Sequence, residues 1–148
     1  LNGFDGTLLE STYLDKETYG FVGEVTNVNT ALLDALTAAG IVPVIACIGA
    51  TKQGQALNIN GDTVASEIAL AVKAESLLLV TDVSGIRIHD EYQKEVTEAD
   101  SNGWIEEGHI YGGMIPKVQG AIQCLHAGIP SVQIVNDTLT GTTIKNEG

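Results

Sequence analysis

Hydrophobic residues along the chain form two kinds of pattern: stretches with helical spacing and short runs that are almost wholly apolar. Apolar positions three or four residues apart form one face of a helix, whereas short β-branched runs between polar turns are typical of strands. The helical pattern predicts helices at residues 30–39, 63–74 and 114–127, and a weaker one near residues 104–107. The short apolar runs, and shorter mixed segments between polar turns, predict strands at residues 7–10, 20–28, 41–48, 55–59, 76–83, 131–135 and 141–144.

The order of these elements predicts the fold class. Gly40 and Gly128 follow the first and third of the long helices, at the place where a left-handed residue commonly closes a helix. The run at 41–48 is nearly all apolar, so we expect a strand that is covered on both faces. Strands that alternate with helices predict a single α/β domain with a mostly parallel sheet over residues 1–148. In such sheets ligands bind beyond the carboxyl ends of the strands.

Composition fits a globular protein and disfavours two classes of partner. The 148 residues are 44% hydrophobic and 18% charged, and the 19 acidic and 7 basic residues give a net charge of -12. A nucleic-acid binder needs a basic surface, and anionic membranes attract one, so we expect neither partner. The longest apolar runs are far shorter than the ~20 residues of a membrane-spanning helix.

The two cysteines indicate the cellular compartment, and the first residues indicate whether the chain is a whole protein. Cys47 and Cys124 lie in apolar segments, which predicts reduced thiols in a cytoplasmic protein rather than a disulfide framework. The chain opens with Leu-Asn-Gly, without an initiator methionine or a charged leader. We therefore expect this chain to be a piece of a longer protein.

The first loop that could carry chemistry joins a predicted strand to the helix at 63–74. Asn58 and Asn60 fall on one side of the strand by alternation, and Asp62 falls at the start of the helix. Asp62 could simply cap the helix by accepting backbone N–H groups. Two amides and a carboxylate at the end of a strand could also orient a small polar substrate and nearby cationic side chains. The two interpretations are compatible.

The second loop, residues 81–86, leaves the apolar run at 77–80. Its sequence, T-D-V-S-G-I, is consistent with an ordinary turn between elements. It is also consistent with the edge of a nucleotide site, in which Asp82 faces the ligand while Val83 and Ile86 form apolar walls for a base.

The third loop, G-G-M-I-P-K at residues 112–117, is the most informative. Pro116 is favourable in a first helical turn, and the two glycines before it permit unusual backbone geometry. Lys117 therefore lies near the partially positive end of a helix, where a cation is disfavoured by a few tenths of a kcal/mol unless an anion lies beside it. Helix N-termini bind phosphate, so Lys117 could face a phosphate there. The alternative is that its side chain extends into solvent.

Several other kinds of site are disfavoured. His89, His109 and His126 lack the spacing of a zinc site, so we assign no metal ligands. The chain has no Walker A, G-x-G-x-x-G or G-x-S-x-G motif, which argues against P-loop enzymes, dinucleotide-binding dehydrogenases and α/β-hydrolases.

Taken in order, N-I-N-G-D-T at 58–63, T-D-V-S-G-I at 81–86 and G-G-M-I-P-K-V at 112–118 resemble the amino acid kinase family. The similarity extends to G-F-V-G-E-V at 20–25 and G-T-T-I at 141–144, so it covers nearly the whole chain. The resemblance implies a three-layer αβα sandwich of the carbamate kinase type. It also implies that this chain is the nucleotide-binding lobe and that the family's amino-terminal substrate lobe lies outside it.

The activity that the resemblance implies is ATP-dependent phosphorylation of the γ-carboxylate of N-acetyl-L-glutamate, a step of arginine biosynthesis. ATP and Mg²⁺ are then the expected cofactors, since phosphoryl transfer needs positioning and charge neutralisation. A homo-oligomer is expected when the protein is full length, and this chain alone is expected to be inactive. Another amino acid kinase, such as an aspartate, glutamate 5- or uridylate kinase, or a non-catalytic nucleotide-binding module, remains an alternative.

The resemblance also implies roles for the residues that match the family's motifs. Asn58 and Asn60 would contact acetylglutamate, Asp62 would organise the catalytic lysines, and Lys117 would stabilise the transferring phosphoryl group. Gly61 stands where the family usually has alanine, and the stretch 136–140 is shorter than in many members. The predicted nucleotide-binding residues are Thr81, Asp82, Val83, Ser84, Gly85, Ile86, Arg87, His109, Ile110, Tyr111, Gly112 and Gly113.

Overall fold

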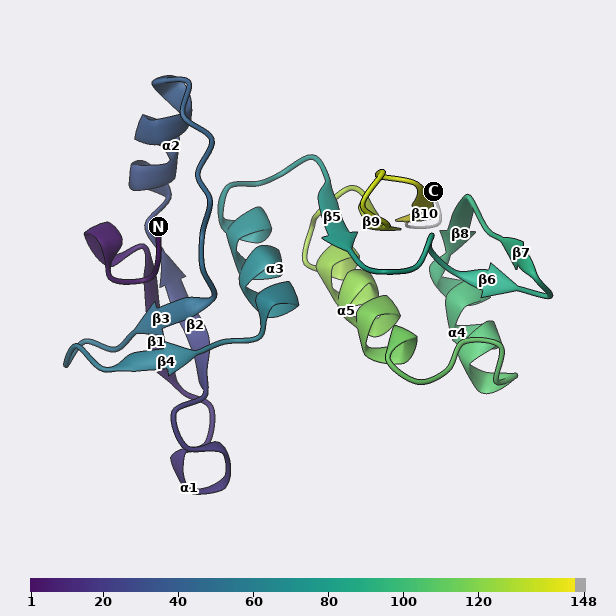
Figure 1. The fold of residues 1–148 in the computed structure, drawn as a ribbon, viewed down its shortest axis with the longest axis horizontal. Coiled ribbons are helices and arrows are strands. Elements are labelled where there is room, and N and C mark those ends of the chain that lie inside the picture. The colour runs from purple at the N-terminus through teal and green to yellow at the C-terminus, as the bar shows by residue number, and fades with distance from the viewer. Residues whose placement is uncertain (146–148) are drawn as a thin grey trace. The chain divides into compact units, whose positions relative to one another are not determined.

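The computed structural model describes residues 1–145 and divides the chain into two compact units, Leu1–Val72 and Lys73–Gly148 (Figure 1). Each unit has its own four-stranded sheet. The α/β class expected from the sequence is confirmed, although both sheets mix parallel and antiparallel pairs. In the described part of the chain, no helix has both the length and the apolar character needed to cross a membrane.

The first unit is built on a sheet of order β2-β1-β3-β4. Its core is a cluster of buried residues from the start of β1, α2, the segment after β4, and α3. The cluster comprises Leu8, Leu9, Leu33, Ile59 and Val64. The elements are a 3-10 turn Asp5–Thr7, β1 Leu9–Tyr13, α1 Lys16–Tyr19, β2 Gly23–Val28, α2 Thr30–Ala38, β3 Ile48–Ala50, β4 Ala56–Asn58 and α3 Gly61–Ala71.

The strand predicted over residues 41–48 is wrong for all but its last residue, since β3 begins at Ile48. The expectation of cover on both faces is wrong as well: Val42 and Val44 are 84% and 80% exposed. Ile45 and Cys47 pack against the core cluster instead. The segment therefore has one covered face, and Pro43, which lacks an N–H group, cannot donate to a ladder there.

The second unit has a sheet of order β5-β9-β10-β8 and a separate two-stranded ribbon, β6-β7. Helix α5 packs on β9, and α4 follows directly after β8 (Figure 1). The elements are β5 Leu77–Val80, β6 Arg87–Ile88, β7 Glu91–Tyr92, β8 Glu95–Thr97, α4 Glu98–Glu106, α5 Met114–His126, β9 Val132–Val135 and β10 Gly141–Lys145.

The long helices agree with their sequence signals. Helices α2 and α5 end within one residue of the predicted positions, and Gly40 and Gly128 follow them with φ of 75° and 114°. Positive φ is the backbone conformation that glycine adopts at no steric cost, so each glycine closes its helix as expected. The weak helix predicted near 104–107 is the end of α4, which begins earlier because Thr97 and Asp100 form a capping box.

Candidate functional site

A cavity of about 440 Å³ lies within the second unit, between the loop after β5, the β6-β7 ribbon and the loop that leads into α5. The loop after β5 follows a strand and the loop into α5 precedes a helix, which is where an α/β sheet presents its loops. The lining residues are Thr81, Asp82, Val83, Gly85, Ile86, Arg87, Tyr92, His109, Ile110, Tyr111, Gly113, Met114 and Lys117.

The loop after β5 is held close to the sheet. The Thr81 N–H donates to the Val135 carbonyl at 2.8 Å, which continues the parallel pairing of β5 with β9 for one more residue. The Thr81 hydroxyl donates to the Asp82 carboxylate at 3.1 Å. Ile86, at the other end of the loop, is 1% exposed and forms an apolar wall of the cavity. The loop therefore combines a carboxylate with a buried aliphatic surface.

The start of α5 has no side-chain cap. Gly113 is the N-cap residue and Gly112 has a φ of 59°. The N–H groups of Met114 and Ile115 reach back to the Tyr111 and Gly112 carbonyls at 3.3 Å each, which is long for such a bond. The positive end of the helix therefore faces the cavity without an acidic side chain in its first turn.

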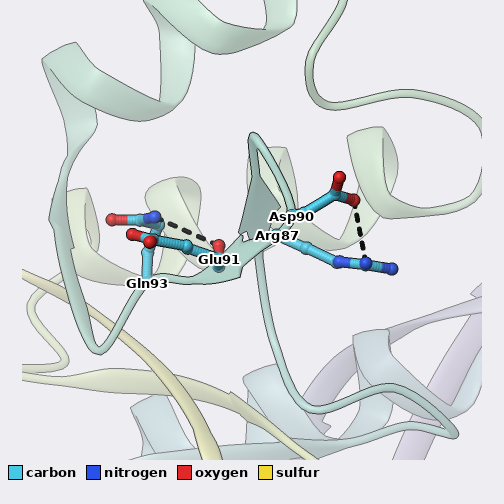
Figure 2. A network of polar contacts seen from close by, with 4 residues as sticks. All are labelled: Arg87, Asp90, Glu91 and Gln93. Atoms are coloured by element: carbon cyan, nitrogen blue, oxygen red, sulfur yellow. Dashed lines mark hydrogen bonds and ion pairs between the residues drawn. The ribbon is translucent and has the colours of Figure 1, made fainter.

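The β6-β7 ribbon contributes Arg87 and Tyr92 to the cavity lining, and Figure 2 shows its polar contacts. The Arg87 guanidinium donates to Asp90 at 2.8 Å and lies 6.0 Å from the centre of the Tyr92 ring. The turn between the strands consists of His89 and Asp90, which have φ of 48° and 68°. Two consecutive positive φ values are those of the tight turn that fits the twist of a two-residue hairpin.

His109 lines the same cavity and contacts His89 and Trp104. The His109 ring packs edge-on against His89 with 4.5 Å between ring centres, and its Nε2 atom is 3.5 Å from a Glu107 carboxylate oxygen. The N–H groups of His109 and Ile110 both donate to the Trp104 carbonyl, at 2.9 and 3.0 Å. The segment 109–111 is thereby tied to α4.

The structure brings most of the predicted nucleotide residues together around this cavity, together with Lys117. Ser84 and Gly112 do not line it; the Ser84 hydroxyl instead accepts a bond from the Asn136 amide at 3.0 Å. Tyr92 and Met114 line the cavity without having been predicted. Met114 could have been inferred from its place beside Gly113, whereas no motif marks Tyr92.

The other predicted residues lie in the first unit. Asn58 ends β4, and its N–H donates to the Phe21 carbonyl at 2.8 Å. Asn60, rather than Asp62, is the N-cap of α3: its side-chain oxygen accepts from the Thr63 N–H at 3.1 Å. The interpretation of Asp62 as the cap is therefore wrong, since the helix begins two residues earlier than predicted and leaves Asp62 in its first turn.

Comparison with known proteins places these motifs in context. A family model described as "Amino acid kinase family" matches residues 2–136. The acetylglutamate kinase of Halalkalibacterium halodurans is 44% identical over 156 residues, which include 99% of this chain but only 60% of that protein. The chain thus spans less than two thirds of the relative's length.

Solved structures show the same fold. The protein smu.665 of Streptococcus mutans UA159 superposes with a TM-score of 0.83 at 36% identity, over 93% of this chain and 56% of the other. The carbamate kinase of Giardia lamblia superposes with a TM-score of 0.65 at 19% identity, over 85% of this chain and 46% of the other.

Proposed function

Because the chain belongs to the amino acid kinase family, we propose that it is the nucleotide-binding part of an enzyme that uses ATP to phosphorylate the γ-carboxylate of N-acetyl-L-glutamate. The carbamate kinase type of fold expected from the sequence is confirmed by the structural comparisons. The substrate is supported by the acetylglutamate kinase of Halalkalibacterium halodurans, whose similarity extends along almost all of this chain. Arginine biosynthesis in the cytoplasm is the corresponding biological role.

The observation that carries the proposal is the convergence of residues 81–87 and 109–117 on one cavity. Its volume of about 440 Å³ is in the range of small-molecule sites, roughly 300–1,000 Å³. Val83, Ile86 and Ile110 offer apolar contacts to a base. Lys117 and the start of α5 offer positive charge to phosphates at the same cavity.

Phosphoryl transfer depends mainly on positioning and on charge neutralisation, and the cavity residues suit both. The Lys117 ammonium can stabilise negative charge on the transferring group, and Arg87 can bind a phosphate oxygen. Asp82 is the carboxylate among the lining residues, which fits Mg²⁺ because that ion typically uses one or two carboxylates together with nucleotide phosphates. Bound Mg²⁺ would neutralise phosphate charge.

The acceptor side of the reaction is assigned to the first unit. Asn58 and Asn60 are proposed to contact acetylglutamate, and Asp62 to orient the catalytic lysines. Asn60 uses its side-chain oxygen to cap α3, which leaves its amide N–H groups to meet a carboxylate or an acetyl oxygen. The full enzyme is proposed to be a homo-oligomer.

Nucleotide binding tests the proposal directly. Mg-ADP titrated into this chain should give saturable heat in calorimetry and a change in the fluorescence of Trp104, whose carbonyl holds residues 109 and 110. Absence of heat and of any thermal shift at millimolar nucleotide would contradict the nucleotide site.

Product formation with different acceptors distinguishes acetylglutamate kinase activity from that of other amino acid kinases. With ATP and hydroxylamine, acetylglutamate should yield hydroxamate only in a longer version that includes the remainder of the relatives' length. Aspartate, glutamate and uridine monophosphate, offered in place of acetylglutamate, identify another member of the family by the product formed. Hydroxamate formation by the 148-residue chain alone would refute the idea that it is an incomplete catalyst.

A further inference from the structure

One buried side chain outside the cavity lining is bonded to two segments that border the cavity. Thr142 lies in β10 and is completely buried. Its hydroxyl accepts a hydrogen bond from the Ile86 N–H at 2.8 Å and donates one to the Gln93 carbonyl at 2.5 Å. A single hydroxyl thus connects the loop after β5 with the segment that follows β7.

The Thr142 hydroxyl replaces a direct backbone hydrogen bond between Ile86 and Gln93. Strands β6 and β7 pair Arg87 with Tyr92 and Ile88 with Glu91, so Ile86 and Gln93 are the next opposed residues. An antiparallel pair of this kind exchanges two N–H to carbonyl bonds. The Gln93 N–H makes the first of them, to the Ile86 carbonyl at 2.9 Å, whereas the second passes through Thr142.

The neighbouring glycine shows how closely the loop approaches β10. A Cβ atom at Gly85 would lie 2.6 Å from the Thr142 backbone nitrogen and would also overlap the Thr142 hydroxyl oxygen. Gly85 has a φ of 98°, which a side chain would disfavour further. The loop can therefore lie against β10 only because residue 85 has no side chain.

We propose that Thr142 is a positioning residue of the nucleotide site: its buried hydroxyl, inserted between Ile86 and Gln93, fixes the distance between the β5–β6 loop and the β6-β7 ribbon. Gly85, Ile86, Arg87 and Tyr92, on the two sides of this connection, all line the cavity, whereas Thr142 does not. A buried hydroxyl with both partners in place holds its neighbours rigidly, because leaving the Ile86 N–H or the Gln93 carbonyl unpaired is costly. This inference rests on the proposed function, since the positioned cavity is the nucleotide site.

The test replaces the hydroxyl while keeping the branched shape. Thr142→Val should weaken Mg-ADP binding by this chain about tenfold, equivalent to ~1.4 kcal/mol. It should also accelerate hydrogen exchange of the Ile86 amide in the absence of nucleotide. Thr142→Ser retains the hydroxyl and should stay within about twofold of the wild type in affinity. Thr143→Val makes the same replacement on the opposite face of β10 and should behave like the wild type.

The possible outcomes distinguish failure of the positioning role of Thr142 from failure of the proposed nucleotide site. Unchanged affinity in a folded Thr142→Val variant overturns the positioning role, as does a Thr142→Ser variant that binds as weakly as the valine variant. If Thr142→Val does not fold, Thr142→Ala, which places no methyl group beside Gly85, is measured against Thr142→Ser in its place. If the wild type itself fails to bind Mg-ADP while the Ile86 amide still responds to Thr142→Val, the proposed function has failed and the inference falls with it.

Discussion

The Arg87 guanidinium donates to the Asp90 carboxylate at 2.8 Å across the turn of the β6-β7 ribbon (Figure 2). Both side chains are largely exposed, so the pair contributes little to stability, about 0–1 kcal/mol. Arg87 also lines the cavity. If the proposed nucleotide site places a phosphate oxygen on Arg87, that oxygen and Asp90 compete for the same guanidinium.

Removal of that competitor should strengthen nucleotide binding. Asp90→Asn keeps a residue that tolerates positive φ but removes the charge, so the affinity for Mg-ADP should rise about two- to fivefold, measured by calorimetry. Glu91→Gln is the matched control, since it removes the same charge from the neighbouring position of the ribbon. An equal gain in both variants would show that only the overall charge matters.

Lys117 offers the sharpest test of the phosphate assignment. Lys117→Ala should lower the affinity for ADP roughly ten- to a hundredfold, because a charge-assisted contact is worth about 1.5–3 kcal/mol. The free energy of unfolding should change less, because Lys117 lies in the first turn of α5, where the helix dipole disfavours a cation. In a longer, active version the loss of kcat should exceed the loss of affinity.

Lys94→Ala serves as the control for Lys117. Lys94 is exposed and lies outside the cavity lining, so its replacement removes one positive charge without touching the site. Equal affinities for the wild type and the Lys117→Ala variant would remove Lys117 from the site.

Asp62 can be tested separately from the helix cap, because Asn60 performs the capping. Asp62→Asn should leave the unfolding midpoint nearly unchanged, since a first-turn carboxylate contributes only about 0.3–1 kcal/mol. In a longer, active version it should reduce kcat by roughly a hundredfold or more if the carboxylate orients the lysines. Full activity of that variant would exclude a catalytic role. Asn60→Ala is the stability control and should cost about 1 kcal/mol.

The capping box of α4 gives a pH prediction. The N–H and the hydroxyl of Thr97 both donate to the Asp100 carboxylate and hold its pKa below the ordinary value of 3.8. The N–H has the larger effect. A carboxyl whose pKa is depressed by folding stabilises the folded state above pH 3.8, and this stabilisation is lost as the pH falls through the depressed pKa. Thr97→Val removes the hydroxyl but keeps the N–H, so it should raise the pKa of Asp100 only part of the way towards 3.8 in a carboxyl NMR titration.

Asp15 provides the internal control for that titration. Its pKa is lowered by the hydroxyl and N–H of Thr18 in the first unit, so it should stay low in the Thr97→Val variant. A parallel rise of both pKa values would indicate loss of the fold rather than loss of the capping box.

The sequence predicted what depends on local chemistry. Helices α2 and α5 were located because their apolar spacing and closing glycines lie within a few residues of one another. The loops at 81–86 and 112–117 were singled out for their own residues, and the structure shows that they share a cavity.

Features that depend on distant residues were missed. The apolar run at 41–48 resembles a covered strand, but which of its faces is covered depends on the packing of α2 and α3. Tyr92 joins the cavity only because β6 and β7 fold back on each other. Thr142 is one of two threonines in β10, and nothing nearby in the sequence distinguishes it. Its role depends on contacts with residues 86 and 93, which are about fifty positions away.

Two of the segments that line the cavity are held to the rest of the unit in different ways. The loop after β5 is fastened to a four-stranded sheet, whereas β6 and β7 form a ribbon of two short strands whose turn holds two non-glycine residues at positive φ. A two-stranded ribbon is marginally stable in isolation, and a left-handed residue other than glycine costs roughly 1–2 kcal/mol. We therefore expect local opening of this unit to begin at the His89–Asp90 turn, which is the end of the ribbon opposite the Thr142 connection between Ile86 and Gln93.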